Sequence, residues 1–178
     1  MKLDKLKYPV GKFSFPTDFN DDILAEWIAL IEQFPDTLKN EVVTLKEELD
    51  WRYRPEGWNI RQVVHHCADS HMNAFCRFKL TLTEDSLEVK GYFEDRWAEL
   101  ADTTDTPIDW SLDILSGLHS RWITLIKSLN EDELLKTYYH SEYKKTFELR
   151  QVIALYAWHC RHHVAHVVQA KNSQGEYN

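Results

Sequence analysis

Four of the chain's nine histidines fall close together near the C-terminus, at positions 159, 162, 163 and 166. They lie in a run from Leu149 to Ala170 that contains no proline or glycine, which predicts one continuous helix. On a helix, residues four apart are rotated by only about 40° and lie one turn above each other. His159 with His163, and His162 with His166, are such pairs, and either pair could hold one divalent metal ion.

Helical phase favours the pair His159 and His163. These residues share an angular sector with a row of apolar side chains, and that sector should face the protein interior. His166 lies at the edge of the sector, and His162 lies slightly further round. Several imidazoles on one buried face cost free energy unless they are hydrogen-bonded or bound to metal. The density of histidines therefore indicates a metal site, whereas a single histidine would indicate a hydrogen-bonded core residue.

A third imidazole has to come from another helix, and the best source is a segment that holds His65, His66 and His71. By helical phase His71 is the most interior of the three, while His66 lies on a polar stripe with Asp69 and Asn73. Helical phase favours His71, whereas a water-filled cavity along the polar stripe would favour His66, so both residues stay candidates. Three imidazoles leave room for water, as in catalytic zinc sites. A divalent ion there lowers the pKa of bound water or binds a thiol as thiolate.

The composition indicates one globular domain over residues 1–178, with 43% hydrophobic and 13% aromatic residues. The net charge of −8 argues against binding to nucleic acid or to an anionic membrane surface. No apolar run is long enough to span a bilayer. The three cysteines include no CxxC pair, and this favours a reduced, cytoplasmic protein.

Four long amphipathic helices are expected to position the histidines. Their expected capping residues are Asn20 or Asp21, Asn59, Ser111 and Thr146. The second helix should run from Asn59 to Leu82, and Gln62 completes a capping-box pattern at its start. Pro35 should kink the first helix or split it in two.

The remaining segments should connect these helices. Residues 1–19 predict an extended N-terminal arm packed by aromatic side chains. Residues 83–110 form a long acidic link that could carry a short helix around Tyr92 to Leu100. Residues 130–147 should begin with a short helix and could continue as a small hairpin. With no convincing run of alternating strands, the expected fold is an all-α four-helix bundle with a long crossover link between helices 2 and 3.

Two of these segments resemble the motifs of a known family. The stretch from Gly57 to Asn73 is similar to the second-helix motif of the YfiT-like branch of the DinB superfamily, and Trp158 to His166 is similar to its last-helix motif. Shorter matches bring the resemblance to nearly the whole chain, and they are Tyr8–Gly11, Arg77–Leu80, Leu82–Glu84 and Leu118–Trp122.

The resemblance implies a four-helix bundle with a three-histidine site for a divalent ion, Zn²⁺ or Ni²⁺, whose ligands here are His66, His159 and His163. It implies a homodimer and a small-molecule substrate. Members are described as metal-dependent hydrolases, and relatives are S-transferases that join bacillithiol or a similar small thiol to an electrophile. The expected function is such a thiol S-transferase. The alternatives are a hydrolase that uses metal-bound hydroxide and a non-catalytic metal-binding stress module.

Other polar residues near the expected ligands are candidates for supporting roles. Asp69 could act as a base or orient a ligand imidazole, and it could instead face solvent. Arg77 could bind a carboxylate of the thiol or form a surface salt bridge. The remaining candidates for contact with ligands or substrate are His71, Asn73, His162 and His166.

Overall fold

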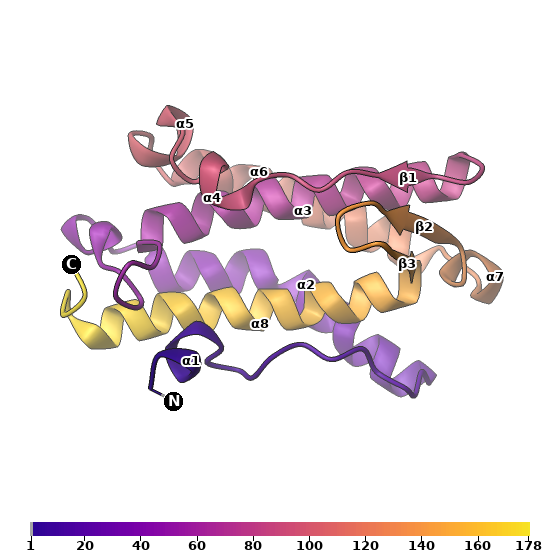
Figure 1. Ribbon diagram of the computed structural model, residues 1–178, viewed down its shortest axis with the longest axis horizontal. Coiled ribbons are helices and arrows are strands. Elements are labelled where there is room, and N and C mark those ends of the chain that lie inside the picture. Colours follow the sequence, from indigo (N-terminus) through magenta and orange to yellow (C-terminus); the bar gives the residue numbers. More distant parts are fainter. Residues whose placement is uncertain (1) are drawn as a thin grey trace.

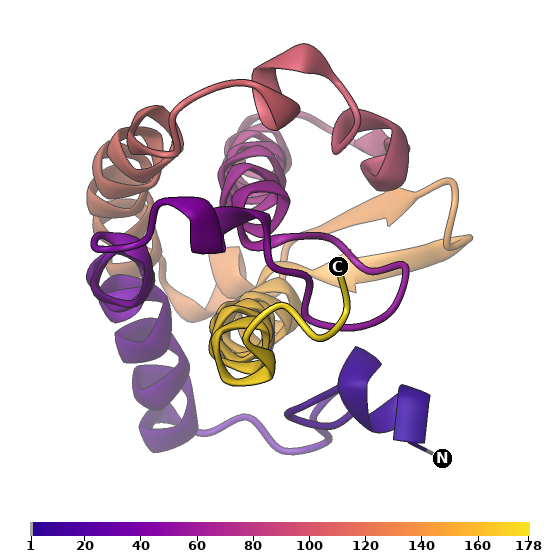
Figure 2. The same cartoon turned by 90° about the vertical axis from the view of Figure 1, so that its left-hand side faces the viewer.

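A bundle of four long helices forms the body of the protein in the computed structural model, which describes residues 2–178 (Figure 1). These helices are α2 (Asp21–Val42), α3 (Ile60–Thr83), α6 (Asp109–Lys127) and α8 (Leu149–Ser173). Helix α2 packs on α6 and α8, and α3 packs on the same two helices. Viewed end-on, they form a ring in the order α2, α6, α3, α8 (Figure 2).

The chain direction within this ring requires a crossover. In Figure 1, α3 and α6 both run from left to right, while α2 and α8 both run from right to left. The link between the parallel neighbours α3 and α6 must therefore return along the length of the bundle. It contains β1 (Glu88–Val89), α4 (Glu94–Trp97) and α5 (Ala101–Thr104). The expected long crossover link and the expected short helix within it are both present.

A small sheet corrects the expectation of a strictly all-α fold. After α7 (Glu131–Leu134), strands β2 (Thr137–His140) and β3 (Lys145–Glu148) form the antiparallel hairpin expected in this segment. Strand β1 adds a parallel third strand to β2, with Glu88 opposite Tyr139. Along β2 the burial alternates, with Tyr138 and His140 inside. Because β1 spans only two residues, its sequence carries no alternation that could predict it.

The expected capping box starts α3. The Asn59 side chain accepts a hydrogen bond from the Gln62 N–H at 2.8 Å, and the Gln62 side chain accepts one from the Asn59 N–H at 3.1 Å. Asn20 caps α2 in the same way, by accepting from the Ile23 N–H at 2.9 Å. These bonds satisfy backbone donors that have no partner within a helix.

The other two expected caps are wrong. Ser111 lies inside α6, whose first residue is Asp109, and its hydroxyl is hydrogen-bonded to His65. Thr146 belongs to strand β3, and Glu148 caps α8 through a capping box with Gln151. Strand β3 of the hairpin is therefore followed directly by α8, the helix that contains four of the histidines.

Helix α2 continues through Pro35 and is not split in two. Proline has no N–H, so the carbonyl of Ile31, four residues earlier, lacks its helical donor. His119 of α6 replaces that donor, since its Nδ1 lies 2.7 Å from the Ile31 oxygen. The proline thus connects α2 to α6 through a buried hydrogen bond.

The N-terminal segment contains a helix, α1 (Lys2–Lys7), where an extended arm was expected. The last carbonyls of α1 accept hydrogen bonds from α8, Leu6 from Gln169 at 3.0 Å and Lys7 from His166 at 3.1 Å. Trp158 also donates to the carbonyl of Gly11 at 3.0 Å. A helix end needs such outside donors, so α8 holds the N-terminal segment in place.

Two further features complete the fold. A 3₁₀ helix, η1 (Glu47–Asp50), lies between α2 and α3, and the loop after it pairs Arg52 with Asn59. In the part of the chain that the structure describes, no helix is both long and apolar enough to cross a bilayer.

Removal of the α3 cap should destabilise the protein. We expect Asn59→Ala to lower the free energy of unfolding by about 1 kcal/mol, because the Gln62 N–H loses its acceptor. Asn59→Asp is the matched control, since it keeps an acceptor oxygen and adds a charge that favours a helix N-terminus. Urea titrations of the three proteins provide the measurement, and an Asn59→Ala variant as stable as wild type contradicts the expectation.

Candidate metal centre

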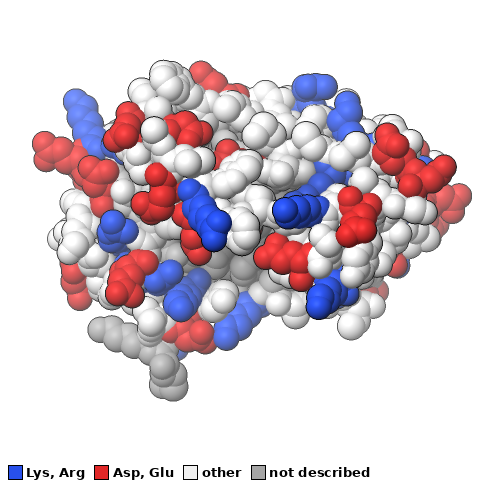
Figure 3. Space-filling model, turned by 45° about the horizontal axis from the view of Figure 1, so that its top comes forward, with Lys and Arg blue, Asp and Glu red and all other residues white. Residues whose placement is uncertain are grey.

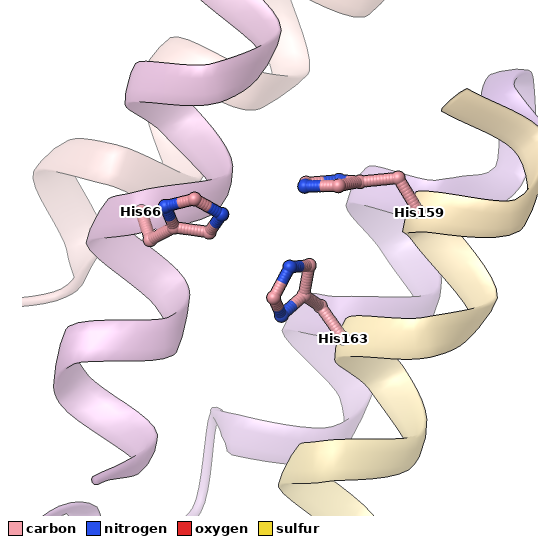
Figure 4. A group of neighbouring side chains, drawn as sticks. All are labelled: His66, His159 and His163. Carbon is pink, nitrogen blue, oxygen red and sulfur yellow. The ribbon is translucent and has the colours of Figure 1, made fainter. Parts of the chain in front are cut away.

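Three histidine side chains from two helices point toward one another (Figure 4). His159 and His163 lie one turn apart on α8, and His66 faces them from α3. One ring nitrogen from each lies within 4.8 Å of those of the other two. The ring centroids are 4.3 Å apart for His159 and His163, and 4.8 Å and 5.5 Å from that of His66 to those of His163 and His159.

Of the two open candidates for a third imidazole, the structure brings His66 to the pair. Its ring lies beside that of Trp58, with the centroids 4.6 Å apart. His71 is completely buried and lies on the other side of His159. The Nε2 of His71 is 3.0 Å from the Nδ1 of His159, so His71 contacts a member of the group without joining the convergence.

Burial keeps these imidazoles uncharged. Desolvation, followed by the neighbouring His162, lowers the pKa of His66 from 6.5 to about 3. Desolvation, followed by the neighbouring imidazoles, holds the pKa of His159 and of His163 well below 6.5. Each ring is therefore neutral at pH 7 and has one nitrogen with a free lone pair, which is the form that binds a metal.

The residues fit a divalent cation in a second way. The Nδ1 atom of His163 is buried and has no hydrogen-bond partner within the described residues. An unsatisfied buried nitrogen costs free energy, and coordination of a cation by its lone pair would remove that cost. Imidazole donors suit Zn²⁺ and Ni²⁺, among other transition metals.

A second group overlaps the first. One ring nitrogen from each of His162, His163 and His166 also lies within 4.8 Å of the others. His162 stacks on Trp158 with centroids 4.4 Å apart, and His166 stacks on Tyr53 at 3.8 Å. The Nε2 of His166 donates to the α1 carbonyl of Lys7, while the Nδ1 atoms of all three residues have no hydrogen-bond partner within the described residues.

The histidines lie in a cavity of about 530 Å³. It is walled by α3 and α8, the hairpin, the link and the N-terminal segment. Its charged lining residues are Lys7, Arg54, Glu56, Arg77, Glu94, Asp95 and Glu142. Figure 3 shows acidic and basic side chains mixed around a hollow on this face. The cavity therefore offers charged contacts of both signs, and the imidazoles form another part of its lining.

The other polar residues expected on α3 separate into two groups. Arg77 lines the histidine cavity and donates to the carbonyl of Lys90 at 3.1 Å. Asp69 instead lines a separate hollow between α3 and α6, together with His65. Asn73 donates to the Asp69 carbonyl, within its own helix. Asp69 therefore does not line the histidine cavity, and this position argues against the expectation that it acts as a base beside the histidines. Burial does raise the pKa of Asp69 to about 6.

The polar stripe of α3 is covered by the crossover link. Gln62 donates to the carbonyl of Ala98 at 2.9 Å, and the Nδ1 of His65 is 2.8 Å from the Ser111 hydroxyl. His66 and Ser70 on the same helix line the histidine cavity. His65 and His66 are therefore both buried, and of the two His66 lines the histidine cavity.

The buried cysteines are unsuited to act as nucleophiles. Burial raises the pKa of both the Cys67 and the Cys160 thiols far above the usual value. A thiol needs an electropositive, accessible environment to ionise at neutral pH. Cys76 is exposed and lies away from the cavity.

The structure gives contacts to two further residues, Tyr156 and His119. Tyr156 lines the cavity, and its hydroxyl donates to the Ser70 carbonyl at 3.0 Å. Its position one turn before His159 on the same face was the available signal. His119 of α6 lies 2.7 Å from His71, Nε2 to Nδ1. A single histidine within an apolar helix face gave no sign of this contact.

Comparisons with known proteins agree with the geometry. The sequence profile described as the DinB superfamily matches residues 31–167. Proteins of Bacillus cereus (strain 03BB102) and Bacillus thuringiensis subsp. konkukian (strain 97-27), both named "Putative metal-dependent hydrolase", are 44% identical over 170 residues, covering 95% of this chain and 97% of theirs. The structure of YfiT from Bacillus subtilis, described as a probable metal-dependent hydrolase with an unusual four-helix bundle topology, gives a TM-score of 0.92 at 37% identity, over 96% of this chain and 98% of that one.

Acid should destabilise the metal-free protein through its buried histidines. In the folded state the pKa of His66 is about 3 and those of His119 and His162 are about 4, all below the ordinary 6.5. Below 6.5 the unfolded chain therefore binds more protons than the folded chain, and the free energy of unfolding should fall as the pH falls. Urea titrations between about pH 7.5 and about pH 5 test this.

The matched variant for this measurement is His162→Gln, which removes one buried imidazole and should make the fall less steep. A free energy of unfolding that is constant over the whole pH range contradicts the expectation.

Proposed function

The chain belongs to the DinB superfamily, and from this membership and the histidine geometry we propose that it is a metal-dependent hydrolase acting on a small molecule. The proposal depends mainly on one observation, the convergence of three neutral imidazoles, two buried and one half-buried, in a cavity. The proposed ligands are His66, His159 and His163, and the proposed ion is Zn²⁺ or Ni²⁺. Relatives that carry the hydrolase name cover nearly the whole chain.

When bound, such an ion supplies a nucleophile at neutral pH by lowering the pKa of a coordinated water or thiol. The chain's own contribution is to hold three neutral donors on rigid helices. His159 and His163 share one helix turn, and His66 is held by the packing of α3 on α8. Aromatic side chains such as Trp58 and Tyr156 exclude bulk water from one side of the group.

The cavity supports a small-molecule substrate. Its volume of about 530 Å³ lies within the range of about 300–1,000 Å³ common for small-molecule sites. The charged groups Arg54, Arg77, Glu94 and Glu142 line it. A substrate with both cationic and anionic groups matches this lining better than an apolar one.

A thiol S-transferase is the second candidate, and two observations favour it. Asp69, which the sequence offered as a base for hydrolysis, lines a different hollow. A thiol held as thiolate needs no separate base to become nucleophilic. Arg77 lines the histidine cavity, where its guanidinium could bind a carboxylate of bacillithiol or a similar small thiol. The expected homodimer and cytoplasmic location stay predictions.

The ligand set can be tested by metal analysis. We expect purified wild type to bind about one divalent ion, and His66→Ala, His159→Ala and His163→Ala each to lower the affinity for Zn²⁺ by more than about 100-fold. Competition with a chromophoric chelator measures this affinity. His140→Ala is the control, because His140 lines the same cavity from the hairpin, and its affinity should match wild type. Full metal binding by His66→Ala contradicts the proposed third ligand.

Dependence on thiol separates the two candidate reactions. As a hydrolase, the Zn²⁺-loaded protein should cleave a probe from a panel of activated esters and amides without added thiol. The rate should drop at least about 100-fold in His159→Ala, the scale on which loss of one stabilising group slows catalysis. Product that forms only when a small thiol and an electrophile are both present supports the transferase and contradicts the hydrolase.

A further inference from the structure

A row of three histidines connects the candidate metal centre to the backbone of α2. The Nδ1 of His159 is 3.0 Å from the Nε2 of His71, and the Nδ1 of His71 is 2.7 Å from the Nε2 of His119. The Nδ1 of His119 is 2.7 Å from the carbonyl oxygen of Ile31. His71 and His119 are both buried, so water does not compete for these bonds.

The carbonyl at the end of this row sets the proton position on every ring. A carbonyl oxygen only accepts, so the Nδ1 of His119 must carry the proton. In a neutral ring the Nε2 of His119 is then an acceptor, so the Nδ1 of His71 must donate to it. By the same step the Nε2 of His71 accepts from the Nδ1 of His159. One assignment satisfies all three bonds, and it leaves the Nε2 of His159 unprotonated.

Pro35 makes that carbonyl available. In an uninterrupted helix the N–H of residue 35 would bond to the oxygen of Ile31, but proline has no N–H. The oxygen is buried inside α2, and His119 is its partner. The proline in α2 therefore determines where the row of histidines ends.

We propose that His71 and His119 are positioning residues that hold His159 in its Nδ1–H tautomer, so that His159 offers its Nε2 to the divalent ion. The inference rests on the proposed metal site and adds two residues that do not touch the ion. Outer partners of this kind commonly orient metal-binding histidines and raise their basicity. Here the partner is a second imidazole, backed by a third, where a carboxylate is more usual.

Packing and burial around the row keep it in this state. Phe34 lies against both rings, with centroids 4.9 Å from His71 and 5.6 Å from His119. Trp122 meets both rings edge-on at 6.0 Å and 5.9 Å. Desolvation lowers the pKa of His119 to about 4 and that of His71 well below 6.5. When all three rings are neutral, no other combination of tautomers keeps all three hydrogen bonds.

The tautomers can be measured directly in metal-free protein. Two-bond ¹⁵N–¹H correlation spectra of the imidazoles at neutral pH distinguish the two neutral forms, and single variants assign the signals. We expect His119, His71 and His159 all to carry the proton on Nδ1. A spectrum with His159 in the Nε2–H form, or as an imidazolium, overturns the proposal. This measurement requires no metal, so it stands even if the proposed function fails.

A pair of variants tests the effect on metal binding. His119→Leu removes both hydrogen bonds and should weaken Zn²⁺ binding about 10- to 100-fold, the usual cost of losing an outer partner. His119→Gln should recover most of the loss, because its amide can donate to Ile31 and accept from His71. His65→Leu is the control for losing a buried histidine outside the row, since the side chain of His65 is hydrogen-bonded to Ser111, and it should bind as wild type does.

Equal affinities of His119→Leu and His119→Gln, or a wild-type affinity in His119→Leu, overturn the proposal. If His119→Leu does not fold, as judged by circular dichroism, the Gln variant and the wild-type tautomers decide. Wild-type protein that binds no Zn²⁺ contradicts the proposed function instead, and the tautomer spectrum then tests the row alone.

Discussion

The cost of burying uncharged imidazoles governs the centre of this protein. Eight of its nine histidines are buried, and desolvation is the largest cause wherever their pKa is lowered. Four of these eight rings are hydrogen-bonded to a hydroxyl, a carbonyl or another ring, as His65 is to Ser111 and His166 is to Lys7. The unsatisfied nitrogens of His162 and His163 border the cavity. Nitrogens of His65, His140 and His166 are also unsatisfied within the described residues, so only the convergence of ring nitrogens distinguishes the candidate ligands.

Features that depend on neighbours in sequence could be predicted. The extent of α8 follows from its long run without proline or glycine, and the Asn59 capping box needs only residues three apart. The hairpin also follows from local signals. Strand β1 and helix α1 could not be predicted in this way, because their partners lie far along the chain. Strand β1 pairs with Tyr139, and α1 ends on side chains of α8 such as Gln169.

The choice of third imidazole shows a limit of helical phase. Phase assumes one buried face, but α3 is covered on more than one side, by α6 and α8 and by the link over Gln62. His66 and His71 can then both be buried while facing different neighbours. Only the packing of α3 on α8 brings His66 close to His159 and His163, so the sequence of α3 alone could not identify the third imidazole. The hydrogen bond of His119 could not be predicted for a similar reason, because its partner depends on Pro35 in another helix.

The crossover topology has a consequence for how the protein acquires its shape. His66 and His159 are separated by about half of the chain, and the parallel neighbours α3 and α6 are joined by a link that spans the bundle. Contacts between such distant segments carry a high loop-closure entropy, and chains rich in them fold slowly. A nascent chain that has emerged only as far as α6 holds one of the three converging imidazoles. The other two emerge only with α8, so the three imidazoles can converge only after the last helix has been made.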